Sequence, residues 1–280
     1  MKKNDEFFVG YLDEVGPSTR KKLKRTVLGI VAILVLGAAL FAFFQKPFAN
    51  STFELTKKTK LTGVYHESPY PLLRTVSEDG EIQNVLLVGF GKRSVLGVMR
   101  KLGDVHQKTL DIEGNLIYYD GKTVLQVVIE EDVSISNSEA TPLPEAHSMG
   151  NQVFEGEIVD PKCFFGVMKP GHGKIHRSCA VRCISGGIPP VLATTDDPDG
   201  PKYLMLVNEE GQPLDASILP HVGKSLRIHG ELLTMDDWHL LKVQNEGIVH
   251  TEKPLQFIED GKCQSDCAHL HIQEAFAMER

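Results

Sequence analysis

The stretch GNLIYYDGKTVLQV, residues 114–127, recurs without a gap as GELLTMDDWHLLKV, residues 230–243. Both copies place apolar residues two, three, eleven and thirteen positions after the glycine, and an aspartate six positions after it. Apolar runs on either side of an Asp-containing turn are typical of two antiparallel strands. The sequence therefore predicts the same strand, turn and returning strand twice.

The residues upstream of each hairpin match in the same order. Gly63 and Gly156 begin similar short segments, and the apolar runs 85–88 and 204–207 are alike. Ordered matches at three places favour tandem related domains over coincidence. We predict a mainly β chain, with a first domain over 61–135, a linker over 136–150 and a second domain over 151–250. Between the strands of the first domain we expect a short helix over 92–101, ended by Gly103.

The order of elements in each unit is a Gly-containing strand, a second strand, a connecting segment and a Gly-led hairpin. This order resembles the oligonucleotide/oligosaccharide-binding (OB) fold, a five-stranded Greek-key barrel, over about 57–135 and 150–250. That fold carries many unrelated functions, so the resemblance implies no particular activity. The formal net charge of −7 and pI near 5.9 weigh against a nucleic-acid partner, because such binding depends on clustered Lys and Arg.

The N-terminal part predicts a membrane-spanning helix. Residues 1–25 are polar and end in a basic cluster, and residues 26–44 follow without a charge. At 1.5 Å of rise per residue, such a segment is long enough for a hydrocarbon core of about 30 Å. A cleaved signal peptide is the alternative, although its apolar core would be shorter and its basic flank nearer the start. Residues 45–60 are expected to form a linker.

The distribution of positive charge predicts the orientation of the chain. Basic residues are concentrated just before the apolar segment and spread out after it. The positive-inside rule therefore places residues 1–25 in the cytoplasm and the rest of the chain outside it. In a bacterium this means a single-pass protein of the cytoplasmic membrane with periplasmic domains. Its expected partner is a membrane protein complex in the same bilayer.

The second unit is longer than the first because of one cysteine-rich insertion. Gly63 and Leu87 are 24 positions apart, whereas Gly156 and Leu206 are 50 apart. The extra length, residues 161–190, contains the candidate ligands Cys163, His176, Cys179 and Cys183. The last two are four residues apart, so on a helix both sulfurs would face the same way, and the glycines at 186 and 187 would end that helix.

The C-terminal tail, residues 251–280, carries a second set of candidate ligands: Cys263, Cys267, His269 and His271. Its Cys-x3-Cys-x3-His run resembles part of the binuclear copper motif of cytochrome oxidase subunit II, over nine residues. The resemblance implies copper binding. Where that family has a methionine three positions after the histidine, this chain has Glu274.

Three interpretations of these residues stay open from the sequence. Thiolates and imidazoles could bind Zn²⁺ or Cu⁺ in an accessory protein of a membrane redox or assembly system, which is our leading hypothesis. Cys163 could instead form a disulfide with Cys179 or Cys183 and staple a non-catalytic interaction module. A thiol oxidoreductase is the third possibility. No hydrolase or dehydrogenase motif occurs, so an enzyme is the less favoured class.

Overall fold

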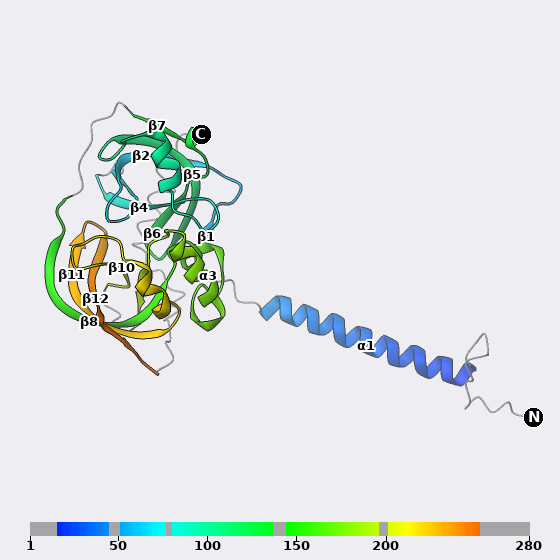
Figure 1. Ribbon diagram of the computed structural model, residues 1–280. Coiled ribbons are helices and arrows are strands. Elements are labelled where there is room, and N and C mark those ends of the chain that lie inside the picture. The colour runs from blue at the N-terminus through cyan, green and yellow to red at the C-terminus, as the bar shows by residue number, and fades with distance from the viewer. Residues whose placement is uncertain (1–15, 45–50, 77–79, 137–143, 196–200, 253–280) are drawn as a thin grey trace, which may run out of the picture. The chain divides into compact units, whose positions relative to one another are not determined.

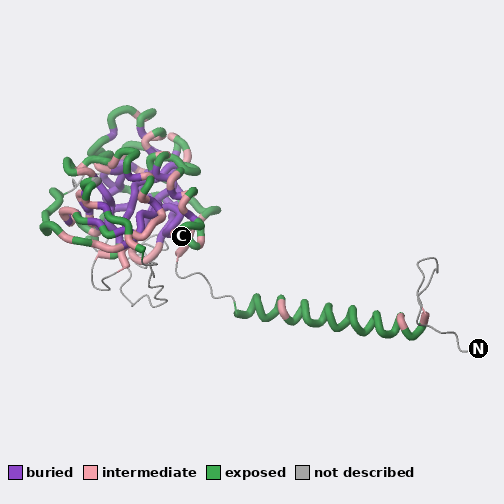
Figure 2. The backbone as a smooth tube through the Cα atoms, turned by 60° about the horizontal axis from the view of Figure 1, so that its bottom comes forward, coloured by how far each residue is buried: buried purple, intermediate pink, exposed green. Residues whose placement is uncertain are grey.

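A computed structural model describes residues 16–44, 51–76, 80–136, 144–195 and 201–252 (Figure 1). The chain divides into two units, one that includes helix α1 and one that includes all the strands. Helix α1 spans Pro17–Phe44 and none of its residues is buried (Figure 2). It is long and apolar enough to cross a bilayer, as a membrane anchor or a signal sequence would be.

The first barrel contains five strands that close on themselves in the order β2-β3-β4-β6-β5. Two short strands, β1 and β7, pair with β5 outside this ring, and two short helical turns follow β4. The elements are β1 (Thr52–Phe53), β2 (Thr59–His66), β3 (Leu72–Val76), β4 (Ile82–Val88), α2 (Leu96–Met99), a 3₁₀ turn (Arg100–Leu102), β5 (Thr109–Tyr119), β6 (Lys122–Gln126), a 3₁₀ turn (Glu130–Asp132) and β7 (Val133–Ile135).

The second barrel closes in the equivalent order, β8-β9-β10-β12-β11. Its cysteine-rich insertion lies between the first two of these strands. The elements are β8 (His147–Val159), a π-helical turn (Cys163–Val167), α3 (Gly173–Ser185), β9 (Val191–Thr194), β10 (Tyr203–Val207), a 3₁₀ helix (Ala216–His221), β11 (Ser225–Met235) and β12 (Trp238–His250).

The two barrels share one topology, which confirms the prediction of tandem OB-like domains. In each, the third and fifth strands pair in parallel and the fourth and fifth form the predicted hairpin. The registers agree residue for residue: Leu116 pairs with Leu125, as Leu232 pairs with Leu241. At Gly114 and Gly230 a Cβ atom would overlap the carbonyl oxygen of the facing strand, so glycine is required where the sheet closes.

Apolar side chains form three cores, one inside each barrel and one between the barrels. Strand β4 alternates between two of them, because Leu87 points into its own barrel while Leu86 and Val88 face the other barrel. Strand β10 alternates in the same way. The continuous apolar runs seen in the sequence are therefore strands with both faces buried. Figure 2 shows the result as a continuous buried interior in the strand-containing unit.

The contacts between the barrels are reciprocal, as around a two-fold axis. The hairpin turn of the second barrel brings Asp236 to the side chains of Arg74 (2.9 Å) and Asn84 (3.1 Å) in the first. The equivalent turn of the first barrel brings Asp120 to the side chains of Lys202 (3.2 Å) and Tyr203 (3.0 Å) in the second. The hairpin turn of each barrel thus contacts the third strand of the other barrel and a residue beside that strand.

The connection between the first and second strands of each barrel also contacts the third strand of its neighbour or the residue directly after that strand. In one direction the Tyr70 hydroxyl donates to the carbonyl oxygen of Leu206 at 2.6 Å. In the other direction the Lys162 ammonium donates to the carbonyl oxygen of Gly89 at 2.7 Å. The second connection is the cysteine-rich insertion, so the insertion lies in the seam between the two barrels.

The short helix expected over 92–101 begins later than predicted. Helix α2 starts at Leu96, and the following 3₁₀ turn ends before Gly103, as expected. The difference arises because Ser94 forms a β-bridge with Val88, and its hydroxyl accepts a hydrogen bond from the backbone N–H of Leu96 (3.2 Å). Residues 89–94 are therefore a loop, and this loop forms part of the candidate site.

Candidate metal centre

Cys163 is positioned by a helical turn that starts directly after β8. Asp160 is the N-cap: its carboxylate accepts a hydrogen bond from the backbone N–H of Cys163 at 2.8 Å, and Pro161 occupies the first helical position. The turn widens to π-helical geometry over Cys163–Val167. Such π-turns are rare and are frequent at functional sites. The Asp-Pro pair in the sequence is the local signal for this turn.

Cys179 and Cys183 are positioned by α3, four residues apart on one helical face, as the sequence predicted. The buried carboxylate of Glu157, on β8, accepts a hydrogen bond from the N–H of Gly173 at the start of α3. The N-terminal end of a helix carries a partial positive charge, so a negative group at this position stabilises the helix. The helix ends at Ser185, and Gly186 is its C-cap.

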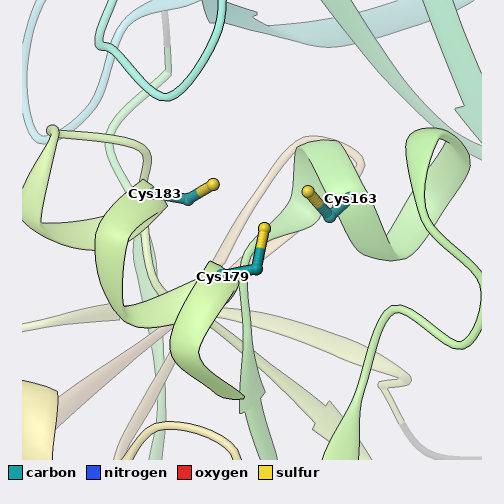
Figure 3. Close-up of side chains that lie close together, drawn as sticks. All are labelled: Cys163, Cys179 and Cys183. Atoms are coloured by element: carbon teal, nitrogen blue, oxygen red, sulfur yellow. The ribbon is translucent and has the colours of Figure 1, made fainter. Parts of the chain in front are cut away.

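The three sulfur atoms converge on one point between the π-turn and α3 (Figure 3). All three lie within 4.8 Å of one another. The thiols of Cys163 and Cys183 are buried and that of Cys179 is partly exposed, which leaves one side of the cluster open to solvent. All three are free thiols, so no disulfide links them.

Two lysines lie against the thiols. Lys92 comes from the first barrel, and its Nζ lies 2.6 Å from the sulfur of Cys179 and 4.0 Å from that of Cys183. Lys162 is buried beside the π-turn, and this burial lowers its pKa to about 8, against the opposing effect of the nearby thiols and Asp160. Positive groups beside a thiol favour its thiolate form.

The two buried thiols share a hydrogen bond, and their pKa values are shifted in opposite directions. A hydrogen bond with Cys163 lowers the pKa of Cys183, and Lys92 lowers it further. The same hydrogen bond and burial raise the pKa of Cys163. Of these two thiols, Cys183 is therefore the one that carries negative charge more readily. The contact with Cys179 raises the pKa of Lys92.

His176 lies next to the cluster and is buried in a pair with Asp160. Its Nε2 atom lies 3.0 Å from the Asp160 carboxylate, and both side chains are almost fully buried. Asp160, Cys163 and His176 also form a set of potential ligand atoms within 4.8 Å of one another. Because Asp160 also bonds the amide of Cys163, it ties the histidine on α3 to the π-turn. Such carboxylate–histidine pairs orient imidazoles around metal ions.

The structure brings together four of the eight residues predicted as ligands. Cys163, Cys179 and Cys183 form the cluster, with His176 beside it. The other four, Cys263, Cys267, His269 and His271, lie outside the described residues. Sequence reasoning missed Asp160, Lys162 and Lys92. The Asp-Pro pair could have indicated the first, whereas nothing local to Lys92 indicates that it faces a cluster in another barrel.

Comparison of the chain with protein-family models, curated proteins and solved structures found no match. The class of protein is therefore defined by its architecture: a tandem OB-like barrel protein with a three-thiol cluster in the seam between barrels. The fold alone implies no function, so any function has to follow from the chemistry of the cluster.

The thiol cluster has the dimensions of a metal site. Metal–sulfur bonds of about 2.3 Å place the sulfurs of one ion about 4 Å apart. The observed limit of 4.8 Å requires only small side-chain movements to reach that geometry. Thiolates are soft ligands and select Cu⁺ or Zn²⁺ over hard cations.

The seam next to the cluster depends on the absence of a side chain at Gly186. A methyl group there would overlap the backbone carbonyl oxygen of Lys92, and the Gly186 carbonyl accepts a hydrogen bond from the Ser94 N–H at 2.8 Å. We expect Gly186→Ala to destabilise the barrels by about 1–3 kcal/mol, as overpacking does. Thermal unfolding followed by circular dichroism measures the effect.

Gly97→Ala is the matched control for this substitution. Gly97 lies on α2 with no atom within 4 Å of an added Cβ, so alanine should be neutral or slightly stabilising. Equal melting temperatures for the two variants would show that residues 89–94 do not pack against the end of α3 as described.

Proposed function

We propose that this chain is a membrane-anchored accessory protein that holds a soft metal ion on Cys163, Cys179 and Cys183. The observation that carries the proposal is the convergence of three free thiols within 4.8 Å, beside two lysines. Cysteines with only a packing role have no need to converge on one point next to buried positive charge. A metal cation bound there would take the place of the thiol protons and would replace the lysine ammonium groups as the positive charge next to the sulfurs.

Cu⁺ is favoured over Zn²⁺ by the number of available ligands. Structural zinc sites are almost always four-coordinate, whereas Cu⁺ accepts fewer soft ligands. The Nε2 atom of His176 already faces Asp160, so the three sulfurs are the soft ligands that converge among the described residues. The partly exposed Cys179 provides the entry side.

The location and partner belong to the same proposal. An apolar helix at the N-terminus supports anchoring in a bacterial cytoplasmic membrane, and the charge distribution supports periplasmic barrels. A tethered metal carrier would serve a membrane redox or assembly complex in the same bilayer. The tail residues Cys263, Cys267, His269 and His271 would form a second ligand set for transfer of the ion.

Metal loading of the full chain tests the proposal. The protein, purified in detergent, is reduced without oxygen, loaded with Cu⁺ or Zn²⁺ in separate samples, and freed of excess metal. We expect about one copper ion per chain to stay with the barrel site. A Cys263→Ser, Cys267→Ser double variant removes the two tail thiols. This variant should still retain the ion at the barrel site. Loss of all copper from the double variant would overturn the assignment to the thiol cluster.

A thiol oxidoreductase is the second candidate, and the coupled Cys163–Cys183 pair favours it. The lowered pKa of Cys183 is the property of an attacking thiol, and Cys163 could resolve a mixed disulfide. Under this alternative the reduced, metal-free chain would accelerate the reduction of insulin by dithiothreitol. Under the metal proposal the chain retains copper and leaves that rate unchanged.

A further inference from the structure

The contact between Lys92 and Cys179 is shorter than a hydrogen bond explains. The Nζ and Sγ atoms are 2.6 Å apart. An N–H···O hydrogen bond is already at its lower limit near 2.7 Å, and sulfur is larger than oxygen, so an N–H···S contact should be longer. Two atoms bonded to a single bridging oxygen atom, by contrast, lie this close together.

Both partners are held in place by backbone contacts. On the N-terminal side of Lys92, Lys162 donates to the carbonyl oxygens of Gly89 and Gly91 at 2.7 and 2.9 Å. On its C-terminal side, the N–H of Ser94 donates to the carbonyl of Gly186 at 2.8 Å. Cys179 lies in the middle of α3. The backbones that carry the amine and the thiol are therefore fixed, and the two groups lie at contact distance, an arrangement that speeds reaction between neighbouring groups.

Exposure distinguishes Cys179 from the other two thiols. Cys163 and Cys183 are buried and hydrogen-bonded to each other. Cys179 is partly exposed and Lys92 is exposed, so a dissolved oxidant reaches this pair first. Susceptibility of cysteine to oxidation follows exposure and positive surroundings.

We propose that Lys92 and Cys179 form a covalent nitrogen–oxygen–sulfur bridge when the protein is exposed to dioxygen. The overall step is Lys-NH₃⁺ + HS-Cys + O₂ → Lys-NH-O-S-Cys + H₂O + H⁺, in which the lysine ammonium first releases one proton to solvent. One oxygen atom forms new bonds to nitrogen and sulfur. The other leaves as water with one hydrogen from the amine and one from the thiol. Nitrogen and sulfur each lose two electrons, and dioxygen takes up all four.

The bridge links the two barrels and removes one sulfur from the cluster. Lys92 belongs to the first barrel and Cys179 to the insertion of the second, so the bridge links the two barrels covalently. A reducing agent returns the amine and the thiol. The consequence for metal binding rests on the proposed function: the reduced chain holds the ion, and the bridged chain does not.

Mass spectrometry of the full chain tests the bridge. The metal-free protein in detergent is exposed to air, alkylated and digested with trypsin. We expect loss of cleavage after Lys92 and a peptide pair containing Lys92 and Cys179, with a mass gain of one oxygen and a loss of two hydrogens. Dithiothreitol should separate the pair. Lys92→Arg keeps the positive charge, and Cys179→Ser keeps the size, and neither should give the linked peptide.

Other oxidation products would overturn the inference. A disulfide loses two hydrogens without gaining oxygen, an unlinked sulfenic acid gains oxygen without losing hydrogen, and a direct nitrogen–sulfur bond contains no oxygen. Finding only these, or no linked peptide, excludes the bridge. The copper content of the reduced chain is measured separately. A bridged chain that binds no copper when reduced would contradict the proposed function alone, and a copper-binding chain without the bridge would contradict this inference alone.

Discussion

Replacing Cys183 by serine should weaken Cu⁺ binding by the reduced chain by more than about a hundredfold, since residues that only orient ligands are already worth 10–100-fold. Cys183 is the buried thiol whose pKa is lowered, chiefly by its hydrogen bond with Cys163, so its loss removes the more readily formed thiolate of the buried pair. Serine keeps the size of the side chain but offers a hard oxygen that Cu⁺ binds poorly. Competition with a Cu⁺ chelator of known affinity measures the change.

Two further variants distinguish a loss of metal binding from a loss of folding. Cys183 is buried in the core between the barrels, so Cys183→Ser can also loosen the fold. Cys179→Ser alters a partly exposed thiol of the same cluster and should weaken binding with an unchanged melting temperature. Ser178→Ala, on the exposed side of the same helix, is the matched control and should leave the affinity unchanged. Wild-type affinity in both cysteine variants would contradict the assigned site.

Replacing Asp236 by asparagine should destabilise the paired barrels by about 3–5 kcal/mol, the cost of removing one partner of a buried ion pair. Asp236 contacts Arg74 across the seam, and their side chains are only 12% and 4% exposed. Without the carboxylate, the buried guanidinium loses this ion pair. Asparagine tolerates the positive φ of 49° at this position, so the turn itself is preserved. Chemical unfolding followed by fluorescence of the buried Trp238 measures the loss.

The pseudo-symmetry of the molecule supplies the control. Asp120 occupies the equivalent turn of the first barrel with a φ of 48°, but its partner Lys202 has a side chain that is 54% exposed. Surface ion pairs contribute about 0–1 kcal/mol, so Asp120→Asn should have a small effect. Similar losses in the two variants would show that burial of Arg74 does not decide the strength of the seam.

Much of the fold could be predicted because the strand signals are local. The hairpin at 114–127 and its repeat at 230–243 have the alternation and the turn residues that strands require, and the structure pairs them in identical registers. The prediction of a helix over 92–101 was partly wrong, because Ser94 takes part in a β-bridge. Bridges of this kind depend on the neighbouring strand, which local propensity does not describe.

The candidate site could be predicted only in part. The spacing of Cys179 and Cys183 on α3 follows from the helical repeat, and the insertion follows from the difference in length between the two units. The contact of Lys92 with Cys179 could not be predicted in this way, because it depends on how one barrel docks on the other. The contact of Lys162 with the carbonyl of Gly89 depends on the same docking.

By itself, therefore, the sequence determined an apolar N-terminal helix, two barrels of one topology and a thiol-bearing insertion in the second. These features depend on short-range periodicity and on glycines at points of close approach. Only the tertiary structure decided that the insertion lies in the seam and that its three sulfurs converge beside lysines from both barrels. The physical reason is that the outer faces of β4 and β10 are apolar and must be buried, and pairing the barrels buries both while closing the seam over the thiols.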